Sequence, residues 1–144
     1  MSAKSPEARP PAVLFVCVKN GGKSQMAAAL MKLEAGNEIA VMSAGTKPGT
    51  AINSLSAEVL LELGIDISAE KPKPLTEENM RAAGIVVVLG TEARVPAIDG
   101  VEIEIWETDE PSLRGIEGRA RMEMLRDDIH ARVIDLKNRL LASR

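Results

Sequence analysis

The residues best suited to chemistry in this sequence lie in one short segment. It reads Cys17-Val18-Lys19-Asn20-Gly21-Gly22-Lys23-Ser24. An apolar run at residues 13–16 precedes it and a helical pattern follows it, so we expect a strand, a loop and a helix start. Backbone N–H groups at such a helix start, with the helix dipole behind them, bind tetrahedral oxyanions. We therefore predict that residues 18–24 bind an oxyanion and that Cys17, at the edge of this positive site, is a thiolate nucleophile.

Three other interpretations of this segment stay open. It differs from the nucleotide-binding pattern Gly-x-x-x-x-Gly-Lys-Ser only by Cys17 in the first position. That function also needs an acidic Mg²⁺ ligand after a hydrophobic strand, whereas the strand expected at residues 85–89 runs into Gly90 and Thr91. Alternatively, Cys17 is a buried and inert thiol. In the third interpretation the loop binds phosphate or sulfate as a sensor or structural ligand, without turnover.

The composition excludes several classes of function. The chain has 144 residues, a formal net charge of −3 and no basic stripe, which argues against nucleic acid or a membrane surface as a partner. One cysteine and one histidine exclude a zinc cluster, an internal disulfide and a Cys-x-x-Cys redox pair, so we expect no metal and no bound cofactor. The apolar runs are far shorter than the roughly 20 residues that span a bilayer. We therefore expect a cytoplasmic protein.

Alternating strands and helices must position the Cys17 loop. Apolar runs predict four strands, at residues 13–16, 38–42, 85–89 and 103–106. Helical patterns predict four helices, from Ser24 to about Leu33, after Asn53 as an N-cap and up to Gly64, from Thr76, and after Pro111. The last helix has an apolar face made of Met122, Leu125, Ile129, Val133, Leu136 and Leu140.

This order of elements predicts an α/β fold. Strands joined through helices form right-handed crossovers, so we expect a three-layer sandwich with a four-stranded parallel sheet. We find no repeat or internal boundary and predict one domain over residues 12–144. Residues 1–11 contain three prolines and few apolar side chains, and they are predicted to be a flexible tail.

The loop resembles that of the low-molecular-weight protein tyrosine phosphatase and arsenate reductase superfamily. In that family a valine-rich strand is followed by Cys, two residues, Asn, two residues, Arg and Ser, and this chain has Cys17, Asn20, Lys23 and Ser24. Lys23 is the only departure. Other segments recur in the family's order, namely Ser43-Ala44-Gly45-Thr46, the Leu-Gly-Ile-Asp segment that ends at Asp66, and Glu110-Pro111 after Trp106. The resemblance covers most of residues 13–140 and implies the family's phosphatase-like fold.

The residues favour one of the chemistries that this resemblance implies. The family's phosphatases place aromatic side chains beside the pocket, whereas Pro111 is followed here by residues 112–114, Ser-Leu-Arg. Thioredoxin-coupled arsenate reductases use three cysteines, and alignment of their valine-rich strand puts Gly90 at the position of the second one. The chain therefore looks like the single-cysteine, mycothiol-linked arsenate reductases. A low-molecular-weight phosphatase acting on phosphoesters is the alternative.

The resemblance to this branch implies a transferase mechanism. Cys17 attacks or activates arsenate, mycothiol takes the arsenic as a thiol-arsenate adduct, and a separate mycoredoxin or glutaredoxin-like protein completes the reduction. Arg binds an oxyanion with a planar two-pronged fork, whereas Lys is a point charge. We expect Lys23 to serve arsenate adequately and phosphoesters, which react slowly without help, poorly.

Further roles are expected for polar residues around the loop. Ser24 is expected to donate to the thiolate, and Asn20 to hold the loop, with Ser43 as a partner. Glu110 is the candidate acid that lets hydroxide leave as water, and Asp109 is the second choice. His130 is expected to be a surface or packing residue without a catalytic role.

Overall fold

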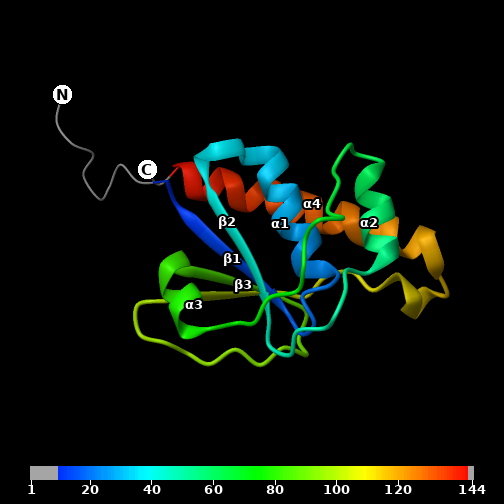
Figure 1. The fold of residues 1–144 in the computed structure, drawn as a ribbon. Helices are drawn as coiled ribbons and strands as arrows, with labels where there is room; N and C mark the ends of the chain where they lie inside the picture. Colours follow the sequence, from blue (N-terminus) through cyan, green and yellow to red (C-terminus); the bar gives the residue numbers. More distant parts are fainter. Residues whose placement is uncertain (1–9, 143–144) are drawn as a thin grey trace.

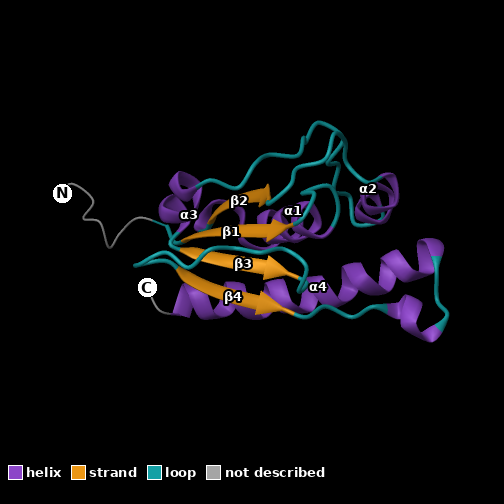
Figure 2. Cartoon of the chain, turned by 90° about the horizontal axis from the view of Figure 1, so that it is seen from below, coloured by secondary structure: helices purple, strands orange, loops and turns teal. Residues whose placement is uncertain are grey.

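A four-stranded parallel sheet forms the centre of the molecule (Figure 1). The structure, a computed structural model, describes residues 10–142. The strands are β1 (Ala12–Cys17), β2 (Ala40–Gly45), β3 (Ile85–Leu89) and β4 (Glu102–Trp106), in the order β2-β1-β3-β4. All neighbouring pairs are parallel, so their carboxyl ends meet at one edge of the sheet, and Figure 2 shows the arrows pointing the same way. Cys17 ends one of the two central strands.

Helices cover both faces of the sheet. They are α1 (Lys23–Ala35), α2 (Ser54–Leu61), α3 (Glu77–Ala83) and α4 (Gly118–Ala142). The larger apolar cluster joins α1, α2 and α4 to the sheet face of Phe15 and Trp106, and the smaller one joins α3 to the face of Leu14 and Val16. Figure 1 shows α3 apart from α4, which runs along the opposite side of the sheet. The predicted three-layer α/β fold is confirmed.

Most predicted elements are present, and two differ in extent. The second strand was expected at residues 38–42, but a 3-10 helix, η2 (Gly36–Glu38), precedes β2. The strand continues to Gly45 because Ser43, Ala44 and Gly45 pair with the last three residues of β1. The final helix does not follow Pro111 directly. A separate 3-10 helix, η3 (Pro111–Arg114), comes before α4.

Local signals in the sequence set several helix ends. The Asn53 side chain accepts a hydrogen bond from the Ser56 amide at 2.9 Å and caps α2, as expected. That helix was expected to run up to Gly64, but it ends at Leu61 with Glu62 as its C-cap, and Gly64, with a φ of +78°, ends the turn that follows. Thr76 caps α3 in a capping box with Asn79. All six residues of the predicted apolar face of α4 are buried.

The amino-terminal boundary of the domain falls within the predicted tail. The Pro11 carbonyl accepts a hydrogen bond from the Ala40 amide at 2.8 Å, so Pro11 already belongs to the edge between β1 and β2. Residues 1–9 of that tail lie outside the described part of the chain. Among the described helices, none has the length and apolar content needed to cross a bilayer.

Candidate active site

In the loop between β1 and α1, several backbone N–H groups point away from the neighbouring segment at residues 46–53. Four loop carbonyls accept hydrogen bonds from the segment at residues 46–53, with Thr46, Lys47, Gly49 and Asn53 as donors to Cys17, Val18, Lys19 and Gly21 at 2.7 to 3.1 Å. In a trans peptide the N–H of the next residue points opposite to the carbonyl. The amides of residues 19, 20 and 22 therefore point away from that segment, and none has an acceptor within residues 10–142.

The start of α1 adds further free donors to this loop. The first helical hydrogen bond runs from the Met26 amide to the Gly22 carbonyl at 2.9 Å, so the amides of residues 23–25 precede the helical ladder. Gly22 is the N-cap residue, and its side chain, a hydrogen atom, leaves these amides open. This concave set of N–H groups at a positive helix end fits a tetrahedral oxyanion.

Two glycines let the backbone close around this loop. A Cβ atom at Gly45, the end of β2, would lie 2.6 Å from the Val18 carbonyl oxygen. A Cβ at Gly21 would lie 2.9 Å from the Ala51 carbonyl oxygen. Both contacts are with backbone atoms, which cannot swing aside. The close approach of residues 45–53 to the loop therefore requires glycine at these two positions.

The thiol of Cys17 is in contact with the hydroxyl of Ser24. The Cys17 Sγ and Ser24 Oγ atoms are 2.9 Å apart, and the Asn20 side-chain amide donates to the same Ser24 Oγ at 2.7 Å. Because Ser24 Oγ already accepts from Asn20, its own proton is free to point at the sulfur. A hydroxyl that donates to sulfur stabilises the thiolate more than the thiol. The contact expected between Ser24 and the thiol is thus present.

Asn20 is the central residue of a buried network. It is fully buried and adopts a left-handed backbone conformation, with φ of +54°. Its Oδ1 atom accepts from the Lys73 amide at 2.9 Å and from Gln25 Nε2 at 3.1 Å, and Gln25 Nε2 also lies 3.1 Å from the Asn20 carbonyl oxygen. The expectation that Ser43 is the partner of Asn20 was wrong. The Asn20 Oδ1 atom accepts from Lys73 and Gln25 instead, and Ser43 lines a cavity that Gln25 also lines.

Sequence reasoning missed Gln25 and Lys73. Gln25 is 2% exposed, and it also reaches the Lys71 carbonyl at 3.2 Å. A glutamine in the first turn of a helix gives no sign that it will be buried. Lys73 acts here through its backbone amide, 53 positions from Asn20, and an amide is common to almost every residue type. No signal in the sequence could have identified either contact.

Lys23 places a positive charge beside the loop. It is the first residue of α1, and no described residue forms an ion pair with its ammonium group. A Cβ atom built on Gly90 would lie 3.8 Å from Lys23 Nζ, so the ammonium group lies beside the end of β3. An unpaired cation next to free amides supports binding of an anion. It supplies a single point charge and no planar fork.

The two candidate acids are held as carboxylates. Two nitrogens of the Arg121 guanidinium group donate to the Glu110 carboxylate, at 2.7 and 2.8 Å, and the Ser112 hydroxyl donates to it at 2.6 Å. Arg121, followed by Ser112, lowers the pKa of Glu110 to about 2. Arg114 likewise lowers the pKa of Asp109 through two hydrogen bonds at 2.8 and 3.0 Å. An ionised and paired carboxylate has no proton to donate, so neither residue is poised as an acid in this conformation, and the acid role of Glu110 or Asp109 stays a prediction.

The aromatic residues and His130 lie away from the loop chemistry. Phe15 and Trp106 are buried with ring centroids 5.8 Å apart, and they form part of the core between the sheet and α4. His130 Nε2 lies 2.7 Å from a carboxylate oxygen of Glu34 and joins α4 to α1, which agrees with a packing role. Within residues 10–142, no cluster of His, Cys, Asp or Glu side chains is placed to hold a metal ion.

Comparison with known proteins identifies the family. The model of the low molecular weight phosphotyrosine protein phosphatase family matches residues 12–142. The chain belongs to this family. The match covers the whole sheet, the Cys17 loop and all four helices, and it confirms the resemblance seen in the loop residues.

Arsenate reductases are among the relatives within this family. A thioredoxin-dependent arsenate reductase from Corynebacterium glutamicum superposes with a TM-score of 0.80 and 34% identity over 95% of this chain, which spans 65% of the length of that protein. Arsenate reductase 1 of Staphylococcus epidermidis is 29% identical over 89% of this chain and 96% of its own length. A glutaredoxin arsenate reductase of Synechocystis sp. is 29% identical over 73% of this chain and 82% of its own length.

Proposed function

We propose that this protein is an arsenate reductase of the thiol-transferase type. The observation that carries the proposal is the Cys17 thiol, whose sulfur lies 2.9 Å from the Ser24 hydroxyl at the edge of a loop rich in free amides. The relatives that carry the name arsenate reductase, from three different bacteria, support the substrate. Oxyanions such as phosphate and sulfate share the shape of arsenate and would compete for the same amides.

The reaction proceeds in two displacements at arsenic. The Cys17 thiolate attacks arsenate, an S–As bond forms, and the oxygen that leaves is released as water after taking up a proton. A low-molecular-weight thiol such as mycothiol then attacks the arsenic, its sulfur gives up a proton, and Cys17 regains its thiol. The arsenic stays pentavalent on this protein. A thiol of a separate mycoredoxin or glutaredoxin-like protein then attacks the mycothiol sulfur, so that a mixed disulfide forms and the S–As bond breaks with its electron pair left on arsenic, which is released as arsenite.

The single cysteine supports an external thiol as the second sulfur. Cys17 is the only cysteine of the 144 residues, so no second sulfur of this chain can displace arsenic from it. Gly90, at the position expected for a second cysteine, has a φ of +94° and lies beside Lys23. The relatives coupled to thioredoxin or glutaredoxin support a thiol partner in general. Our choice of mycothiol rests on the one-cysteine loop, and we place the reaction in the thiol-rich cytoplasm.

Two features disfavour phosphoester hydrolysis by the same loop. The carboxylates that follow β4 are ionised and paired with arginines, and neither can protonate an alkoxide leaving group as it stands. Both aromatic side chains are buried in the core, so neither offers a ring for a phosphotyrosine to stack upon. Arsenate exchanges its oxygens far more readily than a phosphoester does, and it needs less help from an acid.

Turnover with purified components tests this proposal. Wild-type protein and Cys17→Ser are incubated with arsenate, mycothiol and a coupled mycoredoxin system while reductant consumption is followed, with para-nitrophenyl phosphate as a parallel substrate. We expect turnover of arsenate alone and its loss in Cys17→Ser, which retains the amides and still binds phosphate. Ester hydrolysis without arsenate turnover would make the protein a phosphatase. Phosphate binding without either activity would make it an oxyanion-binding domain.

A further inference from the structure

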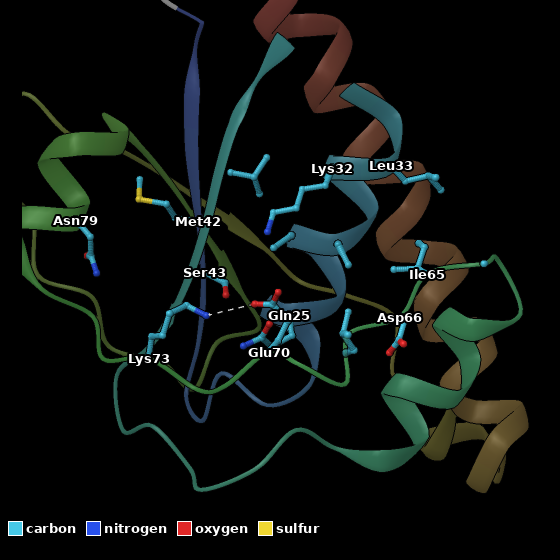
Figure 3. A pocket seen from close by; sticks show the side chains of 15 residues that line it. Gln25, Lys32, Leu33, Met42, Ser43, Ile65, Asp66, Glu70, Lys73 and Asn79 are labelled. Carbon is cyan, nitrogen blue, oxygen red and sulfur yellow. Dashed lines mark ion pairs between the residues drawn. The ribbon is translucent and has the colours of Figure 1, made fainter. Parts of the chain in front are cut away.

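A second site is built against the free edge of β2. A cavity of about 490 Å³ lies between this edge strand, α1 and the segment that follows α2 (Figure 3). Its apolar wall is formed by Ala28, Ala29, Val41, Ile65 and Ile67. Cys17 and Lys23 do not line it. Its volume falls in the range of sites that enclose small organic molecules.

Two lysines, Lys32 and Lys73, line this cavity together with the carboxylates of Asp66 and Glu70. In Figure 3 the ammonium groups of Lys32 and Lys73 point inward from opposite sides, toward Ser43. Lys32 forms no ion pair with a described residue, and Lys73 has one at 3.9 Å, with the half-exposed Glu70. The pKa of Lys73 is lowered mainly by partial burial of a side chain that is still 46% exposed, while Glu70 raises it and Lys32 lowers it. Lys73 is thus paired with Glu70 and also donates to the Lys71 carbonyl at 3.0 Å, so the unpaired charge of the cavity is that of Lys32.

The other polar groups of the cavity agree with an anionic ligand. Ser43 is 6% exposed, and Figure 3 shows its hydroxyl group at the cavity wall. Asp66 is the second acid of the lining, but its carboxylate accepts a hydrogen bond from the Ser68 amide at 2.8 Å. Figure 3 shows Asp66 directed away from the two lysines. The cavity thus offers one positive charge without an ion pair among the described residues, that of Lys32, and one hydroxyl group, that of Ser43.

We propose that this cavity binds a small organic anion, a monocarboxylate with an apolar body of about six carbons. The carboxylate lies between Lys32, Lys73 and Ser43, and the apolar body lies along the alanines of α1. This ligand differs from the substrate of the Cys17 loop, because an inorganic oxyanion has no apolar part to bury. The site therefore goes beyond the proposed function and does not depend on it.

Hydrogen bonds connect the cavity to Cys17. Gln25 and Lys73 line the cavity, and both bind the Asn20 side chain from that side. Asn20 in turn donates to Ser24, which contacts Cys17. A ligand that draws Lys73 toward its carboxylate also moves the Lys73 amide, which donates to Asn20. Movement of Asn20 then shifts the Ser24 hydroxyl that contacts the Cys17 sulfur. The cavity is thus an effector site, read out at Cys17.

Titration with matched six-carbon probes tests the binding site. Hexanoate, hexanamide and hexylamine are added to the ¹⁵N-labelled protein in saturating phosphate, and backbone amide shifts are followed by NMR. We expect hexanoate to shift the Val41 and Ser43 amides and to bind at least about fivefold more tightly than hexanamide, as one partly exposed ion pair allows. Equal binding of all three probes, a preference for hexylamine, or shifts confined to residues 17–24 would overturn the proposal.

Variants of the lining separate this site from general charge effects. Lys32→Met keeps the apolar stem and is expected to remove the preference for hexanoate, whereas Ala28→Trp fills the cavity and removes binding. Lys137→Met, on α4 and outside the lining, is the control with the same change of charge, and it should bind hexanoate like the wild type. Unchanged hexanoate affinity in Lys32→Met would contradict the proposed carboxylate position, even if Ala28→Trp failed to fold.

The rate of Cys17 alkylation tests the coupling. Saturating hexanoate is expected to change the rate of reaction with iodoacetamide at least twofold in the wild type and to leave it unchanged in Ala28→Trp. If hexanoate binds but the alkylation rate stays constant, the cavity is a ligand site without an effector role. This readout needs neither arsenate nor mycothiol, so it is independent of the proposed activity.

Discussion

Two loops follow strands at the same edge of the sheet, and they differ in whether their charged and polar groups have partners. The loop after β1 leaves several amides without acceptors and keeps the Lys23 ammonium group free of ion pairs. The segment at residues 107–114, after β4, pairs the carboxylates of Asp109 and Glu110 with arginines. The first loop has unsatisfied groups of one sign, and the second is close to neutral.

This difference separates binding from support. Unsatisfied donors destabilise an isolated protein, and they persist when a ligand satisfies them. Paired charges do the reverse, because the Glu110–Arg121 pair fixes the segment after β4 against the start of α4. Arg132 adds a second tie by donating to the Glu107 carbonyl at 2.8 Å. We infer that the first loop does the chemistry and that the second fixes the position of α4.

Removing Asn20 should have the largest effect on the first loop. Asn20→Ala leaves the Lys73 amide without its acceptor, removes one of the three acceptors of Gln25 Nε2, and keeps a strained φ of +54°. We expect a loss of roughly 3 kcal/mol in the free energy of unfolding, measured with urea, and more than about 100-fold in arsenate turnover. Asn53→Ala, which removes the cap of α2, is the matched control and should cost about 1 kcal/mol. Equal losses would show that the network around Asn20 is no more than a cap.

Ser24→Ala tests the hydrogen bond to sulfur alone. Loss of one bond to a charged group is worth about 1.5–3 kcal/mol, so we expect a 10- to 100-fold slower alkylation of Cys17 at pH 7 and a similar fall in turnover. Ser56→Ala is the matched control, because Ser56 is equally buried and contacts Met122 instead. An alkylation rate in Ser24→Ala equal to that of the wild type would remove Ser24 from the mechanism.

Lys23→Arg changes the geometry of the cation beside Gly90 and keeps its charge. We expect a fall of up to about tenfold in arsenate turnover, because the larger planar group must fit the space beside Gly90. Hydrolysis of para-nitrophenyl phosphate should stay at background. A large gain in ester hydrolysis would instead identify the chain as a phosphatase that has lost its arginine.

Glu110→Gln should have the smallest effect on turnover, less than about threefold. A true general acid would cost about 100-fold or more. The change should be visible in stability, because the pKa of Glu110 is lowered from 4.5 to about 2 by its arginine and serine partners. A carboxyl group whose pKa is lower in the folded than in the unfolded protein stabilises the fold at pH values above its unfolded pKa. That stabilisation is lost as the pH falls toward the folded pKa of about 2.

Urea midpoints at several pH values check the Glu110 prediction. The wild type should be more stable than Glu110→Gln at pH 7, and the difference should shrink between about pH 4.5 and 2. Glu77→Gln is a useful control, since its Arg81 pair is exposed and should contribute little. A large loss of turnover in Glu110→Gln would mean that the segment after β4 rearranges when substrate binds and frees its carboxylate.

Much of the fold could be predicted from the sequence, because the signals for it are local. Apolar runs of residues such as 85–89 indicate buried strands, and the three- and four-residue spacing on α4 marks its buried face. Asn53 and Thr76 cap the helices at whose starts they were predicted to lie. The extent of β2 was missed, because its last three residues become strand only by pairing with β1.

The sequence by itself determined the single thiol, the glycine-containing loop before a helix and the alternation that gives a parallel sheet. Each depends on residue type and on neighbours within a turn or a strand. The tertiary structure alone decided that Gln25 and Lys73 hold Asn20, that Ser43 lines a separate cavity, and that arginines neutralise both candidate acids. These contacts depend on which backbone and side-chain groups meet in space, and many residue types could supply the same donors. The spacing of residues along the chain does not indicate which of these groups come into contact.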